Sequence, residues 1–99
     1  MSKVIIGSIA LAYHLPSVRA PNDYDIVCNY ETMRKTLKNQ KVKSTYPINS
    51  GEKQVAFLVD GRIFEIEIAW PESLSEEFIK LVEQDSSTII YEDGNLLPS

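Results

Sequence analysis

The feature that most constrains the fold is a short apolar strand, a glycine turn and a second strand that opens with two aspartates. The apolar run Val4–Ile6 precedes Gly7-Ser8, and the second strand begins Asp23-x-Asp25 about fifteen residues later. Because residues two apart on a strand share a face, the two aspartates stand side by side, about 6.5–7 Å apart along the backbone. The sequence therefore predicts an acidic strand beside a tight turn.

The two aspartates and the glycine turn suggest a metal and a phosphate. Neighbouring carboxylates repel each other unless a cation lies between them. Hard divalent cations such as Mg²⁺, or Mn²⁺ in its place, take oxygen ligands and keep positions open for phosphates. Gly7 allows a backbone to approach a ligand closely, and Ser8 offers a hydroxyl beside the amides of a helix N-terminus. We therefore expect metal and phosphate sites close together.

These residues, taken together, resemble a known signature. Gly7-Ser8, then Arg19, then Asp23-x-Asp25 with an apolar tail is similar to the signature of the nucleotidyltransferase superfamily of the DNA polymerase β type. Within this superfamily, the pattern is most similar to that of small prokaryotic and phage members, including antitoxin-like ones. The resemblance implies a magnesium-dependent nucleotidyltransferase that binds a nucleoside triphosphate such as ATP. It implies Asp23 and Asp25 as catalytic metal ligands, with Gly7, Ser8 and Arg19 binding the nucleotide.

The superfamily takes a third acid from a later strand. Glu65 and Glu67 share one face of the predicted strand over residues 62–69 and are the candidates here. Glu67 is preferred because it lies further from the hairpin turn, and Glu65 remains open as the metal ligand. The family usually carries aspartate at this place. The resemblance implies that two Mg²⁺ ions, about 3.5–4 Å apart, are held by the two aspartates and a glutamate.

The sequence does not determine which acceptor receives the nucleotide or whether the domain is an active enzyme. A protein hydroxyl, an RNA end or a small molecule would each serve as acceptor. Superfamily enzymes usually add a helical region, and this chain ends at Ser99, so it is a fragment, a minimal enzyme or a degenerate domain. The alternative function is a catalytically degenerate module that binds a nucleotide or a partner protein. A third interpretation is a small interaction module whose acidic face only aids solubility.

Length and composition limit the number of domains and the classes of partner. With 99 residues, 43% of them apolar and 24% charged, the chain predicts one globular domain over residues 1–99. The net charge of −4 argues against a broad nucleic-acid surface. A single cysteine, Cys28, has no partner for an internal disulfide. Because no apolar run approaches the length of a membrane span, we expect a cytoplasmic protein with no membrane partner.

The predicted fold class is α+β, with a nucleotidyltransferase-like core of mixed sheet and helices packed mainly on one face. Asp60-Gly61 between two alternating runs is the strongest hairpin signal. Asn29 is a fair N-cap, and Ser73-x-x-Glu76 is a capping box. The helices are predicted over residues 8–15, 30–39 and 74–84, the last with the apolar stripe Leu74, Phe78, Leu81 and Val82. The strands are predicted over residues 3–6, 23–28, 42–46, 53–59, 62–69 and 88–91.

Overall fold

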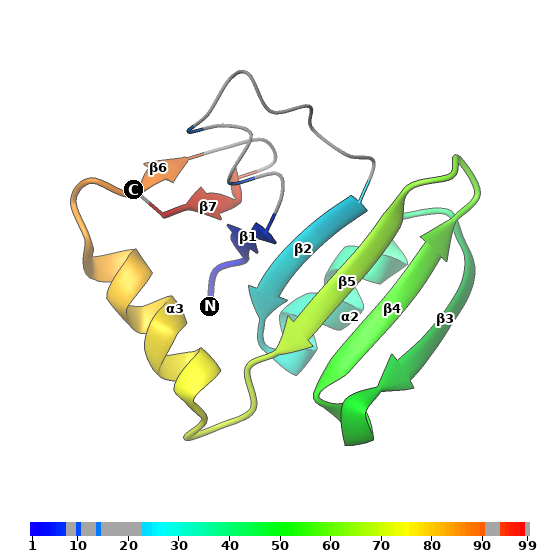
Figure 1. Ribbon diagram of the computed structural model, residues 1–99, viewed down its shortest axis with the longest axis horizontal. Helices are drawn as coiled ribbons and strands as arrows, with labels where there is room; N and C mark the ends of the chain where they lie inside the picture. The colour runs from blue at the N-terminus through cyan, green and yellow to red at the C-terminus, as the bar shows by residue number, and fades with distance from the viewer. Residues whose placement is uncertain (8–9, 11–13, 15–22, 91–93, 99) are drawn as a thin grey trace.

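A computed structural model of the chain describes residues 1–7, 10, 14, 23–90 and 94–98. Its described part is built on one seven-stranded mixed sheet with the order β3-β4-β5-β2-β1-β7-β6 (Figure 1). The strands are β1 (Val4–Ile6), β2 (Asp23–Cys28), β3 (Val42–Ile48), β4 (Lys53–Leu58), β5 (Ile63–Ile68), β6 (Ile89–Ile90) and β7 (Leu96–Leu97). The helical elements are α2 (Tyr30–Lys38), α3 (Leu74–Gln84) and the short 3-10 helix η1 (Asn49–Gly51).

Strand β2 lies at the centre of the sheet and joins two kinds of pairing. It runs antiparallel to β1, with Ile5 beside Ile26, and parallel to β5, with Ile26 beside Ile66. Strands β3, β4 and β5 form an antiparallel meander on one side. The predicted hairpin between β4 and β5 is present, but its turn spans residues 59–61 rather than Asp60-Gly61 alone, because Leu58 donates its backbone N–H to the Arg62 carbonyl. The Asp60 carboxylate accepts a hydrogen bond from the Arg62 backbone N–H and forms an ion pair with the Arg62 side chain.

Alternation along β2 divides the core into two clusters on opposite faces. Ile26 and Cys28 point to one face, where Met33 of α2 completes the larger cluster. Val27 points to the other face, beside Val4 of β1. There Ile79 and Val82 of α3 pack against both valines. We name these the α2 face and the α3 face. In Figure 1 α2 lies behind β5 and β2, whereas α3 lies to one side, beyond the chain's N-terminus.

The expected fold class, an α+β nucleotidyltransferase-like core, is wrong. The described part is mostly a seven-stranded mixed sheet with two short α-helices, which fits a β-rich fold. The helices also pack on opposite faces rather than mainly on one. The physical reason lies in Val4 and Val27, which share the face of the aspartates and need apolar cover, and α3 supplies it. The predicted helix over residues 8–15 falls largely outside the described residues.

Both described helices begin at the predicted caps. The Asn29 side chain accepts a hydrogen bond from the Thr32 N–H at 2.9 Å, and the Ser73 hydroxyl accepts one from the Glu76 N–H at 3.1 Å. The reciprocal half of the capping box is shifted, because Glu76 accepts from the Glu72 N–H. The caps therefore fix where α2 and α3 start.

The predicted apolar stripe of α3 is only partly right. Ile79 and Val82 are buried, whereas Leu74 is 90% exposed and Leu81 is 59% exposed. Phe78, also placed in that stripe, is exposed as well. The helix is thus rotated relative to the prediction so that Ile79 meets the sheet. Within the described residues, none of the helices is long and apolar enough to cross a membrane.

Candidate functional site

The acidic residues singled out in the sequence gather on the α3 face, beyond the part that α3 covers. Asp25 of β2 lies directly beside Glu65 of β5 in the parallel pairing, and Val27 lies beside Glu67. Asp23 stands at the exposed start of β2, where its neighbour is Ile63. Because alternate residues share a face, the structure brings Asp23, Asp25, Glu65 and Glu67 onto one side of two neighbouring strands.

Gly7 lies against the Asp25 carboxylate, at the point where β1 ends. The backbone of Gly7 has φ of +71°, and a Cβ built on it would lie 3.0 Å from both Cβ and Cγ of Asp25, and closer still to its Oδ2. A side chain at this position therefore has no room while Asp25 keeps its place. In this structure the group against Gly7 is the Asp25 carboxylate, and the predicted approach of a phosphate to the Gly7 backbone stays a prediction.

The environment of Asp25 disfavours its charged form. Partial burial raises the pKa of its carboxyl above the ordinary value of 3.8, and the neighbouring charge of Glu65 raises it further. Lys53 of β4 acts in the opposite direction, and Asp23 adds a smaller increase. The Lys53 ammonium lies 3.2 Å from Glu65 Oε1, so it compensates part of the negative charge. The two central carboxylates therefore lie side by side with a shortage of positive charge.

Glu67 has a partner of its own. The Ser75 hydroxyl of α3 donates a hydrogen bond to its carboxylate. Glu67 also lies opposite Lys53 in the antiparallel pairing of β4 and β5. A small cavity of about 140 Å³ is lined by Asp25, Glu65, Glu67 and Lys53, with Ile6 and Ile26 beside them. Within this cavity Glu65 lies next to Asp25, and Glu67 lies two residues further along β5.

The cluster falls short of a preformed metal cage. Among the residues that the structure describes, no three His, Cys, Asp or Glu side chains are grouped so that they could hold a metal ion. The other predicted nucleotide contacts, Ser8 and Arg19, lie outside the described residues. The described part of the predicted site is thus Gly7, Asp23, Asp25, Glu65 and Glu67.

Sequence reasoning missed two residues of this site. Lys53 reaches the cluster because the β4–β5 pairing places it beside Glu67 and one diagonal step from Glu65. A two-residue Asp60-Gly61 turn would pair Lys53 with Ile68, whereas the observed register follows from a three-residue turn over residues 59–61. The predicted turn therefore did not indicate this contact, because a change of one residue in register moves every side chain to the other face. Ser75 reaches Glu67 from α3, a contact that depends on how the helix docks. No local pattern in the sequence could have indicated it.

Comparison with known proteins gives a family without an assigned activity. Residues 3–93 match a family described as a domain of unknown function (DUF7277), and the chain belongs to this family. No curated protein and no solved structure matches the chain.

Proposed function

We propose that this chain binds a divalent cation together with a nucleoside triphosphate, and transfers the nucleotide from the triphosphate to a hydroxyl acceptor with release of pyrophosphate. The observation that carries the proposal is the Asp25–Glu65 pair, two carboxylates side by side on neighbouring parallel strands. Partial burial and the mutual repulsion raise the pKa of Asp25, so a cation that binds between them relieves an existing electrostatic cost. The Gly7-Ser8 and Arg19 pattern of the sequence supports a neighbouring phosphate site.

The donor set suits one particular way of binding metal. Mg²⁺ is commonly held by one or two protein carboxylates plus waters and substrate phosphates, rather than by an all-protein cage. Asp25 and Glu65 are such a pair, and Asp23 at the open start of β2 is the next available oxygen ligand. A bound divalent cation would neutralise phosphate charge and lower the pKa of the acceptor hydroxyl. The absence of a group of three ligands among the described residues therefore fits a site completed by the nucleotide.

The side chains around this pair have separate roles in the proposal. Asp25 and Glu65 bind the cation, and Glu65 takes the position of the third acid because it is the glutamate beside Asp25. Glu67, held by Ser75, orients α3 against the cluster. Lys53, which is paired with Glu65 in this structure, would be available to bind a phosphate oxygen if a cation took its place beside Glu65. The protein then mainly positions and neutralises, as phosphoryl transfer requires.

Thermal unfolding with metal and nucleotide tests the binding step. A ligand that binds only the folded state raises the unfolding temperature. We expect Mn²⁺ alone to give a small shift, and Mn²⁺ with a non-hydrolysable nucleoside triphosphate to give a larger one than the two separate shifts combined. Asp25→Asn and Glu65→Gln should abolish this excess. The matched control is Glu77→Gln, which removes an exposed acid of α3. An excess that persists in Asp25→Asn would refute the site.

Labelling tests the transfer step. Wild-type protein incubated with α-phosphate-labelled nucleoside triphosphates, Mg²⁺ and cell extract should label an acceptor. Asp23→Asn, Asp25→Asn and Glu65→Gln should each abolish labelling, because the cluster acts as a unit and its losses do not add. Glu67→Gln separates the two glutamates. If Glu67→Gln abolishes labelling while Glu65→Gln spares it, the assignment of the third acid is wrong.

A second candidate function is supported by the Lys53–Glu65 ion pair. The Lys53 ammonium, 3.2 Å from Glu65, already supplies the positive charge that a cation would bring. A module in which this pair persists would bind a nucleotide or a partner protein without transferring anything. Nucleotide-dependent stabilisation without labelling by any nucleotide would favour this function over the enzyme.

A further inference from the structure

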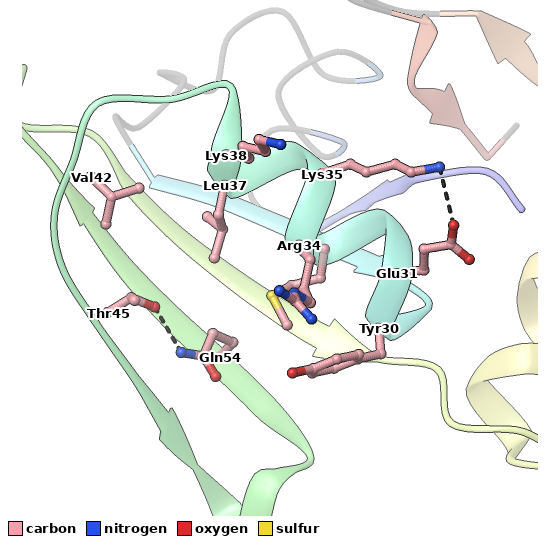
Figure 2. Close-up of a pocket in the computed structure, with 10 residues that line it drawn as sticks. Tyr30, Glu31, Arg34, Lys35, Leu37, Lys38, Val42, Thr45 and Gln54 are labelled. Carbon is pink, nitrogen blue, oxygen red and sulfur yellow. Dashed lines mark hydrogen bonds and ion pairs between the residues drawn. The ribbon is translucent and has the colours of Figure 1, made fainter.

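We infer that the groove between α2 and strands β3 and β4 binds a short stretch of single-stranded nucleic acid. The groove has a volume of about 680 Å³, within the range of pockets that hold small ligands. Figure 2 shows α2 on one side of it and the hydrogen-bonded Thr45 and Gln54 side chains on the other. The groove lies on the α2 face, opposite Asp25 and Glu65. The inference therefore stands apart from the proposed nucleotidyl transfer.

The charge of the chain is unevenly distributed, and three cations of its positive segment, Arg34, Lys35 and Lys38, line this groove together with the acid Glu31. Residues 32–51 contain no Asp or Glu and five of the ten Lys and Arg residues. Those five are Arg34, Lys35, Lys38, Lys41 and Lys43. This segment therefore carries +5, and the rest of the chain, with five cations and 14 acids, carries −9. An anionic ligand is attracted to this side of an otherwise acidic protein.

Arg34 and Lys38 are the cations available to a ligand. Lys35 is paired with Glu31 at 3.2 Å, whereas neither Arg34 nor Lys38 forms an ion pair with a described residue. Arg34 extends from α2 and is one of the residues that line the groove (Figure 2). Both cations line the groove and are exposed. A phosphate backbone following the groove would therefore meet two unpaired positive charges.

The remaining lining favours bases over an acidic peptide. Tyr30 is 44% exposed at one end of the groove, and the Arg34 guanidinium lies 6.0 Å from its ring centre. Aromatic rings and guanidinium planes are the surfaces on which unpaired bases stack. The apolar side chains of Leu37 and Val42 also line the groove and suit the flat face of a base. An extended peptide would instead add to the free edge of β3, outside this groove.

The chain contains its own reporter for this site. Its single tryptophan, Trp70, stacks on Tyr30 with ring centres 5.4 Å apart and an angle of 19° between the planes. A base that stacks against Tyr30 changes the surroundings of this pair. Trp70 emission should therefore change on titration with a uridine oligonucleotide of about twelve residues, near the length that one binding domain contacts. An unchanged emission at saturating oligonucleotide would overturn the inference.

Salt dependence and variants test the electrostatic part. For single strands the logarithm of affinity falls with the logarithm of salt by about 0.7 for each phosphate contact. The Arg34→Gln/Lys38→Gln variant should lower this slope by about 1.4 and weaken fluorescence-anisotropy binding of the labelled oligonucleotide. Lys80→Gln on α3 removes one charge away from the groove and should leave the slope unchanged. Tyr30→Leu should weaken binding while keeping the slope, because it removes a stacking surface and no charge.

Two outcomes identify a wrong assignment. Equal slopes for wild type and the Arg34→Gln/Lys38→Gln variant would show that the groove is not where the oligonucleotide binds. The groove would be a peptide site instead if a labelled polyglutamate peptide bound the wild type, bound the Arg34→Gln/Lys38→Gln variant more weakly, and the oligonucleotide bound neither. Asp25→Asn should leave oligonucleotide affinity unchanged, because it lies on the opposite face. Failure of nucleotide binding and failure of this inference are thereby distinguishable.

Discussion

Replacing Gly7 by alanine tests the contact at the centre of the candidate site. The φ of +71° at Gly7 belongs to the left-handed region, where an alanine costs about 1–2 kcal/mol. The new methyl group would also lie 3.0 Å or less from Asp25 atoms, and overpacking of this kind costs about 1–3 kcal/mol. Gly7→Ala should therefore lower the free energy of unfolding by about 2–5 kcal/mol.

Gly61→Ala is the matched control for the backbone cost alone. Gly61 has φ of +92° in the hairpin turn, and a Cβ there would have no neighbour within 4 Å. Its loss should be limited to about 1–2 kcal/mol. In a domain of this size 1 kcal/mol corresponds to about 4–8 °C in unfolding temperature, so circular dichroism melts resolve the difference.

The Asp25→Ala background isolates the carboxylate. There Gly7→Ala should cost less than in wild type, because the carboxylate is gone and only the Asp25 Cβ position remains close. Equal losses for Gly7→Ala and Gly61→Ala, or an unchanged cost of Gly7→Ala in the Asp25→Ala background, would refute the reasoning.

Three further predictions concern the same fold. The pKa of Asp25 is raised in the folded state, so its stabilising contribution is present below pH 3.8 and is lost as pH rises through the raised pKa. Asp25→Asn should accordingly raise the unfolding temperature at pH 7 and flatten its decline with pH, and a lower temperature would contradict this. Asn29→Ala should cost about 1 kcal/mol in urea unfolding, because the Thr32 N–H loses its acceptor. Ile66→Ala, at a fully buried position, should cost about 2–5 kcal/mol, whereas Val59→Ala, 66% exposed, should be nearly neutral.

The sequence was most informative where the signal is local. Strand β2 over Asp23–Cys28 follows from alternation of period two, and Asn29 caps the next helix as its side chain predicts. The existence of the β4–β5 hairpin was predictable because a hairpin needs only its own residues, although its register follows from a three-residue turn over residues 59–61. The presence of an acidic cluster was predictable for the same reason, since Asp25 and Glu65 each sit on a strand with a clear pattern.

The neighbour relations of the site were not predictable. Whether Glu65 or Glu67 lies beside Asp25 depends on the register between β2 and β5, and no turn connects these two strands. A shift of two residues would keep every side chain on its face and place Glu67 beside Asp25 and Glu65 beside Asp23. The preference for Glu67 used distance from the turn, which says nothing about a parallel partner far away in sequence.

The rotation of α3 and the class of the fold depend on distant contacts too. Apolar residues occupy more than one side of α3, so Leu74 and Ile79 both belong to plausible stripes. The sheet decides between them, because Val4 and Val27 offer an apolar surface to Ile79. Strand β7 pairs with β1 near the opposite end of the chain, with Val4 beside Leu96. Such a short strand has no periodicity to detect.

The arrangement of the sheet separates the two proposed sites physically. Ile26 lies between them in β2, buried on the α2 face, while its neighbour Asp25 points to the α3 face. Carboxylates outnumber cations around Asp25 and Glu65, where Lys53 is the neighbouring cation, and cations outnumber carboxylates around Arg34 and Lys38, where Glu31 is the neighbouring acid. An anion drawn to α2 therefore meets no carboxylate of the Asp25 cluster there. If both proposals hold, this separation would let an acidic protein bind an anionic strand without weakening its cation site.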